Sequence, residues 1–133
     1  MRLFIDTNIF LEIILEQEKV EDAKALLSKI EEHDFFISDF SLHSIGLLLF
    51  YRKQQDIFQQ FIKDMIVDTG IPITSLSVDD MESVVNASQK FNLDFDDAYQ
   101  YVTAEKYDLI IVSFDSDFDR AERGRKTPGE ILI

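Results

Sequence analysis

Short apolar runs recur along this chain of 133 residues, and longer segments with helical spacing separate them. The clearest run is Leu109–Val112, four consecutive apolar residues with strong β preference. The other runs are Leu3–Ile5, Phe35–Ile37, Ile71–Ile73 and Ile131–Ile133. Continuous apolar strands that alternate with helices are typical of a parallel sheet covered on both faces. The sequence therefore predicts an α/β fold: a three-layer α/β/α sandwich with about five parallel strands, in a single domain over residues 1–133.

Amphipathic segments fill the intervals between these runs. Apolar residues recur three and four apart in residues 8–16, 20–30, 42–49, 57–67, 81–88 and 94–104, which predicts helices there. Asp39 or Ser41 is expected to cap the third of these helices, and Ser77 and Asp94 the last two. Asn92 is expected to end the fifth.

The chain carries 26 acidic and 13 basic side chains, a formal net charge of −13 at pH 7. A surface of that sign repels nucleic acid at long range, so we expect no broad, non-specific nucleic-acid-binding face. No apolar run approaches the ~20 residues of a membrane span, and no secretory signal or membrane partner is expected. The absence of cysteine excludes disulfides and thiolate metal sites and fits a cytoplasmic protein.

Acidic residues stand where two of the predicted strands end. Asp6 follows the run Leu3–Ile5, and Asp115 comes shortly after the run Leu109–Val112. Ligands bind at the carboxyl edge of open α/β sheets, so we expect these carboxylates to meet there. Thr7 and Asn8 supply a hydroxyl, an amide and N–H groups that can satisfy a desolvated carboxylate. Taken alone, Asp6 is better explained as the cap of the following helix.

A third acidic group, Asp94, Asp96 and Asp97, opens a predicted helix. Asp94 is expected to be its N-cap, and the other two carboxylates also favour the positive end of the helix. Asp97 shares a helix face with Tyr101 and Ala104, and we expect that face to point inward. Asp96 is rotated away by ~100°, so Asp97 is the favoured site residue.

Three carboxylates at one sheet edge would raise one another's pKa, and a bound divalent cation reverses that repulsion. An all-oxygen ligand set suits Mg²⁺ or Mn²⁺ rather than Zn²⁺. Such an ion can activate a water and neutralise the charge that develops on a phosphodiester. The sequence therefore predicts an acidic metal site built on Asp6, Asp97 and Asp115. Asp119 is expected in a solvated loop.

Three short motifs stand in order along the chain: Phe4-Ile5-Asp6-Thr7-Asn8, then Asp97-Ala98 within Leu93–Ala104, then Val112-Ser113-Phe114-Asp115-Ser116-Asp117-Phe118. Together they resemble the PIN-domain family, many members of which are VapC-type toxins of toxin–antitoxin pairs. Each motif is short, but their order, their spacing and the total length agree. The likeness covers essentially the whole chain.

The resemblance implies a parallel sheet between helices and a magnesium- or manganese-dependent ribonuclease. It implies metal-binding acids at Asp6, Asp97 and Asp115, with Asp117 as an accessory. Supporting roles are expected for Thr7, Asn8, Ser44 and Ser113. The expected partners are an RNA substrate, an antitoxin protein and a second copy of the chain.

One position departs from the family pattern. The family usually has a glutamate on the helix after the second strand, and Ser44 aligns with it here. A serine cannot hold a metal as a carboxylate does. Asp39 and Glu12 could substitute, although no spacing requires either, and His43 is expected to be a surface or packing residue. The departure favours an alternative: a catalytically weakened PIN-like domain that acts as a protein-interaction module.

The segment 120–126 is basic, with a net charge of +3 that leaves −16 on the rest of the chain. It contains Arg120, Arg123, Arg125 and Lys126. These side chains either end a solvated helix or position a phosphate beside the acids. The sequence leaves both interpretations open.

Two phosphotransfer families also place acids at strand ends. Haloacid dehalogenases need a second acid two residues after the first, where this chain has Asn8. Response regulators usually have paired acids after the first strand, where this chain has Asp6 alone. Both fit poorly, so metal-dependent hydrolysis of RNA is the leading interpretation.

Overall fold

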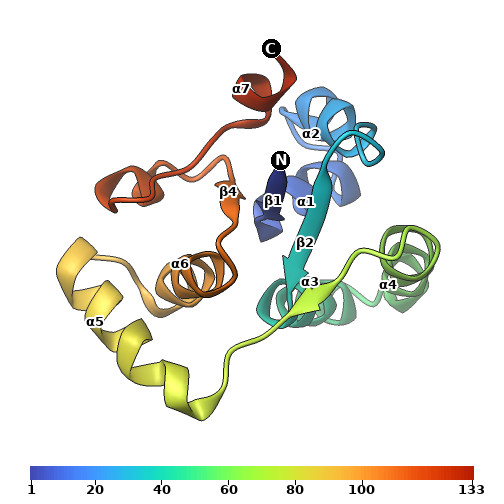
Figure 1. Cartoon of the computed structure of the whole chain (residues 1–133). Coiled ribbons are helices and arrows are strands. Elements are labelled where there is room, and N and C mark those ends of the chain that lie inside the picture. The colour runs from blue at the N-terminus through green and yellow to red at the C-terminus, as the bar shows by residue number, and fades with distance from the viewer.

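The computed structural model describes residues 1–133, and its centre is a four-stranded parallel sheet (Figure 1). The strands are β1 (Arg2–Ile5), β2 (Asp34–Ser38), β3 (Ile73–Thr74) and β4 (Ile110–Val112), in the spatial order β3-β2-β1-β4. β1 is central, with Phe4 paired to Phe36 of β2 on one side and to Ile111 of β4 on the other. The predicted α/β class and parallel sheet are confirmed.

Helices connect the strands and form the outer two layers. They are α1 (Thr7–Ile14), α2 (Val20–Leu27), α3 (Asp39–Tyr51), α4 (Gln55–Phe61), α5 (Met81–Phe91), α6 (Phe95–Tyr107) and α7 (Pro128–Leu132). A π-helical segment, η1 (Ile62–Val67), continues α4, so the helix expected over 57–67 is two elements; η2 (Val78–Asp80) and η3 (Ser116–Arg120) are short 3₁₀ helices. Helices α1–α4 and α7 cover one face of the sheet, and α5, α6 and η3 cover the other (Figure 1).

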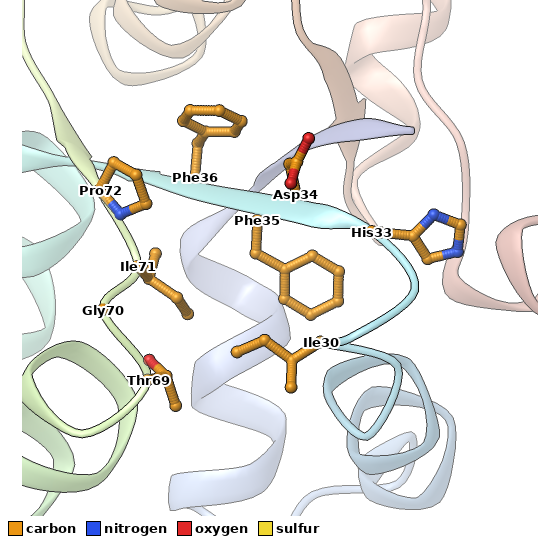
Figure 2. A pocket seen from close by; sticks show the side chains of 9 residues that line it. All are labelled: Ile30, His33, Asp34, Phe35, Phe36, Thr69, Gly70, Ile71 and Pro72. Carbon is orange, nitrogen blue, oxygen red and sulfur yellow. The ribbon is translucent and has the colours of Figure 1, made fainter.

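β2 illustrates burial on both faces of the sheet. Figure 2 shows Phe35 and Phe36 pointing to opposite sides of β2, with Phe35 directed toward Ile30 and Ile71. Phe35 belongs to the apolar core under α1–α4, and Phe36 packs against the core under α5 and α6. Because both faces are buried, the strands appear in the sequence as continuous apolar runs rather than alternating ones. The residues of Figure 2 line a pocket of about 290 Å³ that contains a single acid, Asp34.

The fifth strand expected at Ile131–Ile133 is wrong, because these residues end helix α7. Thr127 caps this helix: its hydroxyl accepts from the Glu130 N–H at 3.3 Å, and the Glu130 carboxylate accepts from the Thr127 N–H at 3.0 Å. Pro128 occupies the first turn, where its missing N–H costs nothing. Ile131 is buried and Ile133 is fully exposed, so only Ile131 of this apolar triplet is fully packed against the core.

A single parallel bridge stands where the fifth strand was expected. Lys126 pairs with Val112, with its N–H donating to the Ile111 carbonyl at 2.8 Å and its carbonyl accepting from the Ser113 N–H at 3.0 Å. This bridge ties the segment after η3 to β4.

Most helix ends follow the local signals in the sequence. Asp94 caps α6 by accepting from the backbone N–H three residues on at 2.9 Å, and Asn92 ends α5 in the left-handed conformation (φ 55°). The cap of α3 differs from the prediction. It is Ser38, whose hydroxyl accepts from the Ser41 N–H at 3.0 Å, and Asp39 is already inside the helix. No helix is long and apolar enough to cross a membrane.

Candidate metal centre

The strand order creates a crevice between β1 and β4. The chain passes from β1 to β2 and β3 on one side, then returns to place β4 on the other side of β1. In open α/β sheets, ligands bind at the carboxyl ends of the strands that flank such a reversal. Asp6 follows β1 directly and Asp115 lies three residues beyond β4. The Asp6 N–H donates to the Val112 carbonyl at 3.0 Å, which holds the two strand ends together.

A hollow of about 240 Å³ lies at this edge, and both aspartates line it. Asp97 reaches it from the first turn of α6, and Asp96 also lies at its rim although the helix rotates it away from Asp97. The remaining lining residues are Thr7, Asn8, Leu11, Phe40, Ser44 and Gln100. The fold thus brings together acids that are more than 100 residues apart in the sequence.

Three carboxylates are close enough to share one cation. One oxygen from each of Asp97, Asp115 and Asp117 lies within 4.8 Å of the other two. Oxygens around a single Mg²⁺ lie at most about 4.2 Å apart, because each is about 2.1 Å from the ion. Small side-chain rotations would close that difference, so the donor set and its spacing fit Mg²⁺ or Mn²⁺. Asp117, expected to be an accessory, is a member of this group, and Asp6 is not.

Asp6 is buried, at 7% exposure, and its two oxygens are held by three donors. Oδ1 accepts from the Thr7 N–H at 2.9 Å and from Gln100 Nε2 at 3.0 Å, and Oδ2 accepts from Ser113 Oγ at 2.6 Å. The carboxylate therefore caps α1 and also faces the hollow.

Ser113 and Asn8 connect the loop after β1 to the loop after β4. Ser113 Oγ accepts from Asn8 Nδ2 at 3.1 Å and from the Asp115 N–H at 2.9 Å. Asn8 Oδ1 in turn accepts from the Phe114 N–H at 3.3 Å. These contacts fix the start of the Asp115 loop relative to Asp6.

A buried polar network behind Asp6 was missed in the sequence. Gln100 Oε1 accepts from Ser38 Oγ at 2.6 Å, and Gln100 Nε2 donates to Ser41 Oγ at 2.8 Å as well as to Asp6. Thr7 Oγ1 also donates to Ser41 Oγ at 2.8 Å. Gln100 lies three residues after Asp97 on a helix whose other buried side chains, apart from Thr103, are apolar or aromatic, and that spacing was the available signal.

Burial and mutual repulsion raise the pKa of two of the acids. Burial raises the pKa of Asp6 even though its hydrogen bonds oppose the shift. Desolvation, followed by the negative charges of Asp115 and Asp94, raises the pKa of Asp97 to about 7. A bound divalent cation would offset this repulsion.

Ser44 lines the hollow at the position where an acid was expected. The two acids considered as substitutes are engaged elsewhere. The Asp39 carboxylate accepts from the Tyr99 hydroxyl at 2.9 Å, and the Glu12 carboxylate accepts from the Lys19 N–H at 2.9 Å. Neither lines the hollow.

The basic segment braces the loop after β4. Each of Arg120, Arg123 and Arg125 pairs with a carboxylate at 3.1–3.2 Å and also donates to a backbone carbonyl. Arg120 pairs with Asp117 and so lies beside the acidic group, whereas Lys126 is exposed. These contacts favour a structural role for the arginines, and RNA binding by the segment stays a prediction.

Comparisons with known proteins bear on the fold and the family of this chain. No curated protein sequence matches the chain. The structure is similar to FitAcB from Neisseria gonorrhoeae, with 19% sequence identity and a TM-score of 0.73 over 96% of this chain and 98% of that chain. It is also similar to a toxin–antitoxin complex from Klebsiella pneumoniae, with 24% identity and a TM-score of 0.71 over 96% of this chain and 98% of that chain. A third similar structure is VapBC2 from Rickettsia felis bound to a promoter DNA fragment, with 13% identity and a TM-score of 0.72 over 95% of this chain and 97% of that chain. At these identities the likeness shows the fold. The model of the PIN domain family matches residues 3–124, which include every acid of the crevice. The chain therefore belongs to the PIN domain family.

Proposed function

We propose that this protein is a divalent-metal-dependent ribonuclease and the toxin of a toxin–antitoxin pair. The observation that carries the proposal is the acidic group Asp97, Asp115 and Asp117, whose oxygens lie within 4.8 Å of one another beside the buried Asp6. Membership of the PIN domain family supports nuclease chemistry. The similar structure of a toxin–antitoxin complex supports the toxin assignment.

In this proposal Asp97, Asp115 and Asp117 would hold the Mg²⁺ or Mn²⁺ ion. The buried Asp6 would add a further negative charge to the same hollow. Once bound, such an ion supplies positive charge for the phosphodiester and activates water. Asp6 keeps one orientation because Ser113 and Gln100 bind its two oxygens. Burial and the neighbouring carboxylates raise the pKa of Asp97 to about 7, so a bound ion would have to displace a proton from part of the Asp97 population near neutral pH.

The second candidate is a weakened PIN domain that acts only by binding a partner. Ser44 favours it, because the hollow lacks an acid there. An apolar groove of about 500 Å³ beside the hollow also favours it. The groove is lined mainly by α3 and α4, and its residues include Leu47 and Phe50, which are 61% and 53% exposed. If the protein is a toxin, its partner is an antitoxin that places a basic side chain among the acids.

The test is Mn²⁺ binding by calorimetry together with cleavage of single-stranded RNA. We expect wild-type protein to bind Mn²⁺ and to cleave, and Asp6→Asn to lower the rate by at least about 100-fold. The matched control is Asp79→Asn, a surface aspartate outside the hollow, which should cleave normally. Unchanged cleavage by Asp6→Asn overturns the catalytic assignment. No Mn²⁺ binding at millimolar concentration selects the second candidate.

A further inference from the structure

Three aromatic rings form a continuous shelf beside the acidic hollow. The ring centroids of Phe40 and Tyr99 lie 5.8 Å apart, and those of Tyr99 and Phe95 lie 6.1 Å apart. Phe40 lines the hollow, and Phe95 stands two residues before Asp97. The shelf therefore begins at the candidate metal centre and leads away from it.

Tyr99 makes the shelf rigid. Its hydroxyl donates to Asp39 Oδ1 at 2.9 Å and accepts from the Leu76 N–H at 3.2 Å, and the residue is 9% exposed. The central ring is therefore held from α3 and from the segment before η2. Phe95 rests against it with 57% of its own surface exposed. An exposed aromatic ring on a fixed support can accept another ring at little cost in ordering.

Charge cannot attract a nucleic acid to this surface. The net charge is −13, and Asp94 and Asp96 flank Phe95 directly. Arg120, which lies beside the acidic group, is already paired with Asp117. Stacking of a base on an aromatic ring needs no positive charge, and every base has a π-face that can use it.

We propose that Phe95, supported by the fixed ring of Tyr99, stacks an unpaired base of the RNA substrate close to the bond that is cut. The inference rests on the proposed ribonuclease function and adds to it a base-stacking position at Phe95. Bases in a duplex are already stacked on their neighbours, so a paired substrate could not use the shelf. Binding should also depend only weakly on salt, because few phosphate contacts release counterions.

The chain contains no tryptophan, so a single tryptophan placed on the shelf reports stacking directly. We expect the fluorescence of the Phe95→Trp variant to be quenched by a single-stranded RNA oligomer and unchanged by the matched duplex. The control is Tyr51→Trp, an aromatic position that is 88% exposed at the far end of α3, ~20 Å along the helix from Asp39. Quenching equal to that of the control, or equal quenching by duplex, overturns the proposal.

A second set of variants separates stacking from simple apolar contact. Phe95→Ala and Phe95→Leu should both weaken binding of the oligomer by about fivefold or more in fluorescence anisotropy, while Phe95→Trp binds at least as well as wild type. Mn²⁺ affinity and Tm should stay unchanged, because Phe95 is largely exposed. Unchanged RNA affinity in Phe95→Ala overturns the base-stacking proposal and favours a protein interface as the role of the exposed Phe95.

The failure of this inference is distinguishable from failure of the proposed function. If wild-type protein cleaves and all Phe95 variants cleave equally well, the shelf alone is wrong. If wild-type protein neither binds nor cleaves RNA, both the ribonuclease proposal and the base-stacking proposal are wrong.

Discussion

Asp6 and Asp97 are the same residue type at the same sheet edge, yet their surroundings differ. Asp6 is almost fully buried and takes hydrogen bonds on both oxygens. Asp97 is half-buried and meets the negative charges of Asp115, Asp94, Asp6 and Asp117. A fixed carboxylate suits orientation of a site, whereas a crowded and accessible one suits binding of an exchangeable cation.

At the residue scale, Ser44 is a position where one substitution should strengthen the metal site. Ser44→Glu adds a carboxylate to a hollow that already contains Asp6, Asp97 and Asp115. We expect Mn²⁺ to bind on the order of tenfold more tightly, because one more negative charge a few ångströms away contributes on the order of 1 kcal/mol or more even in high dielectric. Calorimetric titration measures this, and RNA cleavage should rise with it.

The matched control for that substitution is Ser44→Gln, which has a similar shape without the charge. A gain in Mn²⁺ affinity in both variants would show that shape, not charge, limits the site. No gain in Ser44→Glu would mean that Ser44 lies outside the ligand shell.

At the scale of elements, α6 positions most of the site. Its N-cap fixes the first turn, so that Asp97 faces the acids and Gln100, one turn later, reaches Asp6. Phe95 and Tyr99 lie four apart along another stripe of the same helix and form part of the shelf. Because one helix carries all four side chains, their spacing is set by helix geometry rather than by loops.

The stability of the fold should depend on the capping box of helix α7, which Thr127 and Glu130 form. Thr127→Ala removes the hydroxyl that accepts from the Glu130 N–H, so we expect a loss of about 1 kcal/mol in the free energy of unfolding. Tm should fall by about 4 °C in a thermal melt. Ser83→Ala, at an exposed position on α5, should stay within about 0.5 kcal/mol of wild type. Equal stability of the two variants would contradict the role of this cap.

At the scale of the whole molecule, the fold concentrates negative charge that its own bases do not neutralise. The pKa of Asp97 is raised to about 7 in the folded protein, and its unfolded value is about 3.9. A raised acid pKa stabilises the fold fully below the unfolded value and loses that contribution as pH rises through the folded value. Without metal, Tm should therefore fall as pH rises from about 4 to about 7, and Asp6 acts in the same direction.

Thermal melts in EDTA at several pH values measure this dependence. Asp97→Asn should flatten the profile, and millimolar Mn²⁺ should restore Tm above pH 7 by binding only the folded protein. The pKa values of Asp80 and Glu130 are lowered in the folded protein, so these two acids change stability mainly below about pH 4. They therefore contribute little to the change in Tm between about pH 4 and about pH 7. The same slope in Asp97→Asn as in wild type would show that general repulsion, not this site, sets the profile.

The layers, four of the strands and the acids that line the hollow could be predicted from the sequence. Apolar runs buried on both faces and helices with one apolar stripe are local patterns, and they can be recognised without a structure. The same patterns failed at Ile131–Ile133, where the capping box of Thr127 and Glu130 outweighed an apolar triplet. That capping box is itself a local pattern of the sequence.

Only the tertiary structure decided which acids meet and what surrounds them. The return of the chain across β1 to form β4 places Asp6 beside Asp115, and no local pattern specifies a strand order. The same crossing buries Gln100 against Ser38 and Ser41, commits the arginines to ion pairs and places Asp117 within 4.8 Å of Asp97. Distances between residues far apart in sequence depend on packing of the whole core, which is why the metal group and the aromatic shelf emerged only in three dimensions.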